Sequence, residues 1–115
     1  MHALFHTGSQ SDIEELSSIA DGLSGPVEPK SITIPLVKTF ADDFILVSES
    51  EIRRGIHYAW EQYGERIEGS AAVALAAALN GQVAHRPALV IISGGNIQDE
   101  VFAEITKGIP KKVNL

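Results

Sequence analysis

The spacing of apolar residues predicts a helix at two places in the first half of the chain. Between residues 31 and 40 the apolar positions recur every three or four residues. Pro35 suits the first turn of this helix, where a backbone N–H lacks a partner anyway. Ser48 with Glu51 three residues later matches a capping box and predicts a second helix that runs to about Tyr63. Its apolar positions form one stripe and predict a single buried face: Ile52, Ile56, Ala59, Trp60 and Tyr63.

A third helix is predicted over residues 71–79, where alanine, valine and leucine leave no polar face before Asn80 and Gly81 end it. A helix that is apolar all round is expected to be buried all round. A last helix is predicted from Asn96, as its N-cap, through Ile105 to Gly108.

Two short apolar runs, residues 44–47 and 88–92, are typical of buried strands. The order strand, helix, helix, strand between them is long enough for a parallel crossover. The sequence therefore predicts an α/β fold with a small parallel sheet flanked by helices. Two strands cannot bury an all-apolar helix on every side, so the pattern predicts an oligomer or a missing part of the fold.

The chain is expected to form a single partial α/β domain. Residues 1–30 are small and polar and form a loop-rich lead-in, residues 31–108 hold the predicted helices and strands, and residues 109–115 form a tail. At 115 residues there is no room for a second domain.

Composition narrows the function classes. A net charge of −6 without a basic stripe argues against a nucleic-acid partner. The sequence has no cysteine, which excludes disulfides and thiolate metal sites and fits a reducing compartment. No signal peptide or run of ~20 apolar residues is present, so a cytoplasmic protein with no membrane contact is expected. Glycine patterns for dinucleotides or Walker phosphates are absent.

The run Val90 to Ile92 stops at Ser93, Gly94, Gly95 and Asn96. Glycines at the end of a strand let the backbone approach a neighbour closely. In open α/β sheets, ligands bind beyond the carboxyl ends of strands. This turn is therefore the first candidate binding site.

Four segments, in order, resemble the carboxyl-terminal part of the threonine dehydratase and serine racemase family, which are pyridoxal-phosphate enzymes of the tryptophan synthase β-like fold (fold type II). The likeness extends over about residues 19 to 105. The segments are Ala20-Asp21-Gly22-Leu23, the run from Phe40 to Ile52, the run from Ile67 to Leu75, and Ser93-Gly94-Gly95-Asn96.

The same resemblance shows what these residues lack. Family members carry an amino-terminal Ser-x-Lys-x-Arg-Gly segment, whose lysine forms the Schiff base, and a glycine-rich loop for the cofactor phosphate. Neither occurs in residues 1–115. No catalytic residue is therefore assigned, and stable binding of pyridoxal 5'-phosphate by this chain alone is not expected. The lysines that fall outside any such motif are Lys30, Lys38, Lys107, Lys111 and Lys112.

For the residues present, the resemblance implies roles in cofactor binding. It places the Ser93 hydroxyl on the pyridine nitrogen, with Asn96 completing the turn. Gly94 and Gly95 would let the backbone pass the ring, and Gly22 would lie against a ring face. Glu68 matches an acidic residue near the cofactor, although the family usually has proline where this chain has Gly69.

Structural interpretations compete with each role. Residues 93–96 could be a turn with a helix N-cap, Glu68 an acid favoured at a helix start, and Gly22 a plain turn glycine. His2 and His6 have metal-ligand spacing but no third ligand, so no metal site is predicted. Trp60 and Tyr63 are expected in the core.

Three functions stay open at this point. The first is a fragment or truncated homologue of a threonine or serine dehydratase (ammonia-lyase), inactive alone. The second is one chain of a split enzyme completed by a lysine-bearing partner that acts on a small amino acid. The third is a non-enzymatic α/β module that forms a homo-oligomer through its all-apolar helix.

Overall fold

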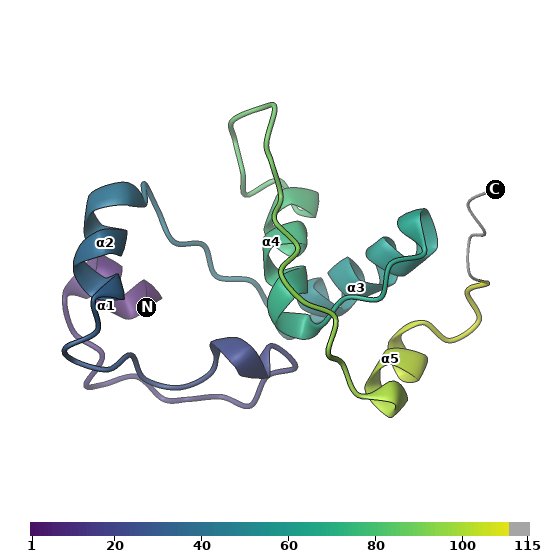
Figure 1. Cartoon of the computed structure of the whole chain (residues 1–115), viewed down its shortest axis with the longest axis horizontal. Helices are drawn as coiled ribbons and strands as arrows, with labels where there is room; N and C mark the ends of the chain where they lie inside the picture. The colour runs from purple at the N-terminus through teal and green to yellow at the C-terminus, as the bar shows by residue number, and fades with distance from the viewer. Residues whose placement is uncertain (111–115) are drawn as a thin grey trace.

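The computed structural model describes residues 1–110, so most of the predicted tail lies outside the described residues. Figure 1 shows a chain of short helices, with α1 and α2 at one end of the molecule and α3, α4 and α5 at the other. The helices are α1 (His2–Thr7), the 3-10 turn η1 (Asp21–Leu23), α2 (Thr33–Phe40), α3 (Glu49–Tyr63), α4 (Gly69–Leu79) and α5 (Asp99–Ile105).

Helix α3 begins at the capping box that the sequence predicts. The Glu51 backbone N–H donates to the Ser48 hydroxyl at 3.3 Å, and the Ser48 N–H donates to the Glu51 carboxylate at 2.6 Å. The carboxylate also accepts from the Asn80 amide at 2.6 Å. Glu51 therefore joins the start of α3 to the end of α4. Gly64 ends the helix with φ +67°, a conformation that glycine adopts without strain.

These hydrogen bonds lower the pKa of Glu51 from its ordinary value of 4.5. The largest contribution comes from the backbone N–H of Ser48, and the next from the Asn80 amide. Because the folded-state pKa is lower than the unfolded one, the stabilisation is complete above the unfolded pKa and disappears as pH falls through the folded pKa. We expect Glu51→Gln to lessen the loss of stability on acidification, measured by urea unfolding between pH 7 and pH 3. The side chain of the exposed Glu65 has no hydrogen-bond or ion-pair partner among the described residues, so Glu65→Gln should retain the wild-type pH dependence.

Helices α3 and α4 pack face to face and form the core. Gly55 of α3 allows the close approach, since a Cβ there would lie 3.0 Å from the Ala72 carbonyl oxygen of α4. Ile56 beside it has no exposed surface. The buried core cluster comprises Ala20, Ile52, Ile56, Ala59, Ile67, Ala71, Ala72 and Phe102.

Two expectations about this packing are met only in part. Trp60 packs on the core, but Tyr63 is 55% exposed and the core assignment for it is wrong. Helix α4 ends where predicted but begins two residues earlier, at Gly69, and Ala74 is exposed, so burial on every side is wrong as well. The reason is that α3 covers one face of α4 only.

The predicted small parallel sheet is wrong, because the described residues contain no strand. Residues 44–47 and 88–92 are not helical, and no backbone–backbone hydrogen bond among the described residues involves either run. The first lies beside α1, where the Phe5 and Phe44 rings are 5.0 Å apart. The second run is anchored to α4 by the residues on either side of it. Before the run, the Arg86 guanidinium donates to the Ala78 carbonyl at 3.3 Å, and after it, the Gly94 carbonyl accepts from the Glu68 N–H at 3.1 Å. Each run therefore lacks the neighbouring strand that a sheet requires.

Residues 1–30 hold more structure than the composition predicts. His6 of α1 lies 3.3 Å from both the Asp43 carboxylate and the Phe44 carbonyl oxygen, which ties the first helix to the chain after α2. The His2 and His6 rings are in contact, with centroids 4.4 Å apart and planes tilted by 55°. Within residues 1–110, no three His, Cys, Asp or Glu side chains gather into a set that could hold a metal ion.

The molecule exposes more surface than a compact protein of its mass. Its accessible area is 8220 Å², against roughly 6100 Å² for a folded monomer of 12.3 kDa. The radius of gyration is 15.6 Å, where about 13 Å is usual for this length. Both excesses agree with the exposure of large apolar side chains such as Leu89 (91%), Phe40 (77%) and Ile91 (72%). None of the helices in the described part of the chain has the length and hydropathy needed to cross a membrane.

Candidate functional site

The loop before α4 and the loop before α5 meet at Glu68, and this contact brings several of the predicted site residues together. The Glu68 N–H donates to the Gly94 carbonyl at 3.1 Å, and the Glu68 carboxylate accepts from the Asn96 N–H at 2.9 Å. Glu68 is the N-cap residue of α4, but its side chain makes no capping bond to that helix. Its carboxylate is therefore engaged with the glycine turn instead of the helix start.

The two glycines of the turn fit closely against this loop. A Cβ at Gly94 would lie 2.6 Å from the Glu68 carboxylate, and one at Gly95 would lie 2.8 Å from the Arg66 carbonyl oxygen. Both distances are too short for a real side chain. A Cβ at Gly95 would meet backbone, so this position requires glycine, whereas a Cβ at Gly94 would displace the Glu68 carboxylate that binds the Asn96 N–H. Contact of this backbone with a cofactor ring stays a prediction.

Gly22 lies on η1 and faces the start of α4. A Cβ there would be 2.8 Å from the Ser70 hydroxyl, which is buried and has no hydrogen-bond partner among the described residues. Gly22 itself is exposed. The structure therefore places Gly22 near α4 and leaves its outer face open.

Ser93 precedes the glycine turn and is exposed. Within residues 1–110, no hydrogen bond or other polar contact engages its hydroxyl. The backbone that follows it is fixed by Glu68, so the hydroxyl is held on an ordered turn and is free to bind a ligand. This arrangement suits the polar end of a heteroaromatic ring.

Asn96 does not cap the last helix, which corrects the sequence prediction. Helix α5 begins at Asp99, and its N-cap is Gln98, without a capping bond from the side chain. The reason lies in the tertiary structure, because the Asn96 N–H donates to Glu68 and the chain needs two more residues before it turns into the helix.

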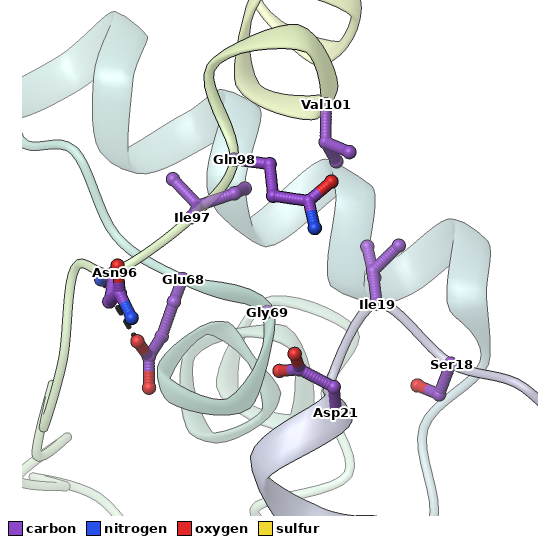
Figure 2. Close-up of a pocket in the computed structure, with 9 residues that line it drawn as sticks. All are labelled: Ser18, Ile19, Asp21, Glu68, Gly69, Asn96, Ile97, Gln98 and Val101. Carbon is purple, nitrogen blue, oxygen red and sulfur yellow. Dashed lines mark hydrogen bonds between the residues drawn. The ribbon is translucent and has the colours of Figure 1, made fainter.

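A pocket of about 210 Å³ lies next to the turn, between the chain leading into η1, the start of α4 and the segment leading into α5 (Figure 2). Of the six predicted site residues, Glu68 and Asn96 line it, and the other four, Ser93 and Gly22 among them, do not. Its other polar side chains come from Ser18, Asp21 and Gln98. The hydrogen bond between Glu68 and Asn96 therefore lies at the edge of the pocket and also fixes the turn that follows the exposed Ser93.

One wall of this pocket is fixed by Glu49, at the start of α3. Its carboxylate accepts hydrogen bonds from the Ser18 hydroxyl and, at 3.0 Å, from the Ile19 backbone N–H. The Ile19 carbonyl lies close against Gly69, where a Cβ would overlap the carbonyl oxygen. The closeness of the two backbones explains why a glycine stands at this position.

The described lysines do not complete a catalytic site. Lys30, Lys38 and Lys107 are all exposed, and none lines the pocket. Lys111 and Lys112 lie outside the described residues. The exposed Ser93 hydroxyl is a group that could donate a hydrogen bond to a ring nitrogen.

Sequence reasoning missed Arg66 and Asp21 as neighbours of the site. Asp21 lies in the segment Ala20-Asp21-Gly22-Leu23, but the sequence analysis gives it no role. Arg66 could have been found from the alternation around Ile67, which is 3% exposed and points into the core. In an extended segment the residues on either side of a buried one point the other way, here toward the glycine turn.

Comparison with known proteins identifies relatives of the chain. The family model for pyridoxal-phosphate dependent enzymes matches residues 1–94. A putative threonine dehydratase from Sinorhizobium fredii is 35% identical over 95% of this chain and 34% of its own length. The catabolic L-threonine dehydratase TdcB from Escherichia coli is 34% identical over 92% of the chain and 33% of its own length.

A solved structure gives the same result. The crystal structure of serine racemase from Dictyostelium discoideum superposes with a TM-score of 0.68 at 35% identity, covering 84% of this chain and 31% of that one. The names of these relatives state that they act on the hydroxy-amino acids threonine and serine. The chain belongs to this pyridoxal-phosphate dependent family, and it spans about a third of the length of the curated relatives it matches.

Proposed function

We propose that this chain forms one wall of the cofactor site in a pyridoxal-phosphate dependent dehydratase that converts L-threonine or L-serine to a 2-oxo acid and ammonia. The observation that carries the proposal is the exposed, unbonded hydroxyl of Ser93 at the head of a turn fixed by Glu68. The relatives' names supply the reaction class. The absence of cysteine suits a cytoplasmic setting.

When bound, pyridoxal phosphate withdraws electrons from the α-carbon of an amino acid. The Ser93 hydroxyl would hold the pyridine nitrogen by a hydrogen bond. A neutral hydroxyl does not stabilise a protonated nitrogen as a carboxylate does, so Ser93 moderates this withdrawal and favours β-elimination over transamination. Gly22 would lie against a ring face, and Glu68 would hold the turn that carries Ser93.

Residues 1–115 are proposed to be catalytically incomplete alone. They contain neither the lysine motif nor the glycine-rich phosphate loop of the family. Their accessible area of 8220 Å² exceeds the roughly 6100 Å² of a compact monomer, which is consistent with a surface that a further segment covers. That segment would belong to the same enzyme or to a separate lysine-bearing chain.

A non-enzymatic module is the second candidate, favoured by the exposed apolar residues Leu89 and Ile91. In that case the exposed surface would be buried against a second copy of the chain. Sedimentation distinguishes the two candidates. The module predicts a stable homo-oligomer at micromolar concentration without any added segment, whereas the dehydratase predicts assembly that depends on the lysine-bearing segment.

The activity test combines this chain with a polypeptide that carries the lysine segment and phosphate loop of a family member, together with pyridoxal 5'-phosphate and L-threonine. We expect 2-oxo acid only when both polypeptides are present. Ser93→Ala should lower kcat/KM by about tenfold or more, because the ring nitrogen loses its hydrogen bond. Ser17→Ala is the matched control, since Ser17 is exposed and has no contact among the described residues, and it should keep full activity. Equal activity of the two variants would contradict the role of Ser93.

A further inference from the structure

Four contacts join the loop at 64–68 to the turn at 94–99, and two of them come from Arg66. One guanidinium nitrogen, Nη2, donates to the Ile97 carbonyl at 2.6 Å and also lies 2.6 Å from the Asp99 carboxylate. Glu68 supplies the other two, through its N–H to Gly94 and its carboxylate to Asn96. Residues 66 and 68 thus hold both ends of the glycine turn.

The Arg66 guanidinium is itself held in place by the core. Its carbon Cζ lies 4.8 Å from the centre of the Phe102 ring, and Phe102 is only 9% exposed. That ring packs edge-on against Trp60, with centroids 5.2 Å apart and planes at 84°. A planar guanidinium over a fixed aromatic ring retains few alternative positions. Arg66 therefore has a defined orientation although its side chain is 40% exposed.

The turn has little freedom to move against this support. Gly95 packs on the Arg66 carbonyl so closely that no Cβ fits there, and a Cβ at Gly94 would displace the Glu68 carboxylate. Ser93 directly precedes this backbone and has no bond of its own in the described part of the chain. The position from which its side chain projects is therefore set by the residues that fix positions 94–97.

We propose that Arg66 is a positioning residue for Ser93. It acts through the Ile97 carbonyl and Asp99, and with Glu68 it fixes the turn that presents the Ser93 hydroxyl to the cofactor. The consequence for cofactor binding rests on the proposed function. The contacts of Arg66 and Glu68 with residues 94–99, called the clamp below, belong to this chain alone.

The first measurement is amide hydrogen exchange of the chain by NMR, with Arg66→Ala compared with Arg53→Ala. Arg53 is the matched control, because it forms a similar surface ion pair with Glu104 at 3.0 Å and is 41% exposed. Arg66→Ala should speed exchange of the Asn96 amide by about tenfold, the equilibrium factor for ~1.4 kcal/mol, and leave the Glu51 amide unchanged. Arg53→Ala should leave both amides unchanged.

The second measurement uses the assembly completed with the lysine-bearing polypeptide. Arg66→Ala should weaken binding of pyridoxal 5'-phosphate by about tenfold while its thermal midpoint matches that of Arg53→Ala. Arg66→Lys, which can still donate to both acceptors, should recover part of the affinity. Unchanged Asn96 exchange, or unchanged cofactor affinity in a binding-competent assembly, would overturn the proposal. If the wild-type assembly binds no cofactor while the exchange result holds, the proposed function fails and the clamp stands.

Discussion

Replacing Gly69 with alanine is expected to destabilise the chain by about 3 kcal/mol or more, because the added Cβ would collide with backbone. It would overlap the Ile19 carbonyl oxygen and come within 2.5 Å of that carbonyl's carbon and 2.9 Å of the Ala20 nitrogen. Alanine is the better helix former by about 1 kcal/mol, which is too little to offset such a clash. Ile19 cannot retreat freely, since Glu49 binds its N–H.

Urea unfolding followed by circular dichroism tests this expectation. Gly22→Ala is the matched control, because its Cβ would meet only the Ser70 side chain, which can rotate, and about 1 kcal/mol or less is expected. Similar unfolding midpoints for the two variants would show that the backbones at Ile19 and Gly69 are not in the close contact described.

Replacing Ile56 with alanine is expected to cost about 3 to 4 kcal/mol. Ile56 is completely buried between α3 and α4, and removal of a buried aliphatic side chain loses its burial and leaves a cavity. Single domains are stable by only about 5 to 15 kcal/mol, so a large part of the total stability would be lost.

Ile32→Ala provides the same chemical change at a position that is 74% exposed, and less than about 0.5 kcal/mol is expected there. The comparison is made by urea unfolding under identical conditions. A cost for Ile56→Ala below about 1 kcal/mol would mean that α3 and α4 do not form the core of the chain in solution.

Helix α3 could be predicted from the sequence because its signals are local. Ser48 and Glu51 are three residues apart and cap α3 as the pattern requires, and the apolar stripe fixes which face of that helix is buried. The predicted strands failed for the opposite reason. A β-branched run favours extended backbone, but whether it joins a sheet depends on a neighbour that the run itself does not specify.

The candidate site shows the same division. The turn at residues 93–96 and Glu68 could be found from motifs, and the structure brings Glu68, Gly94 and Asn96 into contact. The support from Arg66 and the contact of Gly69 with Ile19 depend on segments more than 25 positions apart in the numbering. No local pattern encodes such distances, so they emerge only from the three-dimensional arrangement.

Equilibrium binding of pyridoxal 5'-phosphate tests the central claim most directly, namely that this chain completes a cofactor site through Ser93. The visible absorbance of the lysine-bound cofactor is measured for the chain alone, for the lysine-bearing polypeptide alone, and for the two together. We expect no such absorbance for the chain alone. Binding to the pair should be at least about tenfold tighter than binding to the second polypeptide, and Ser93→Ala should weaken it. Cofactor binding that is unaffected by adding this chain, or equal for wild type and Ser93→Ala in the pair, would contradict it.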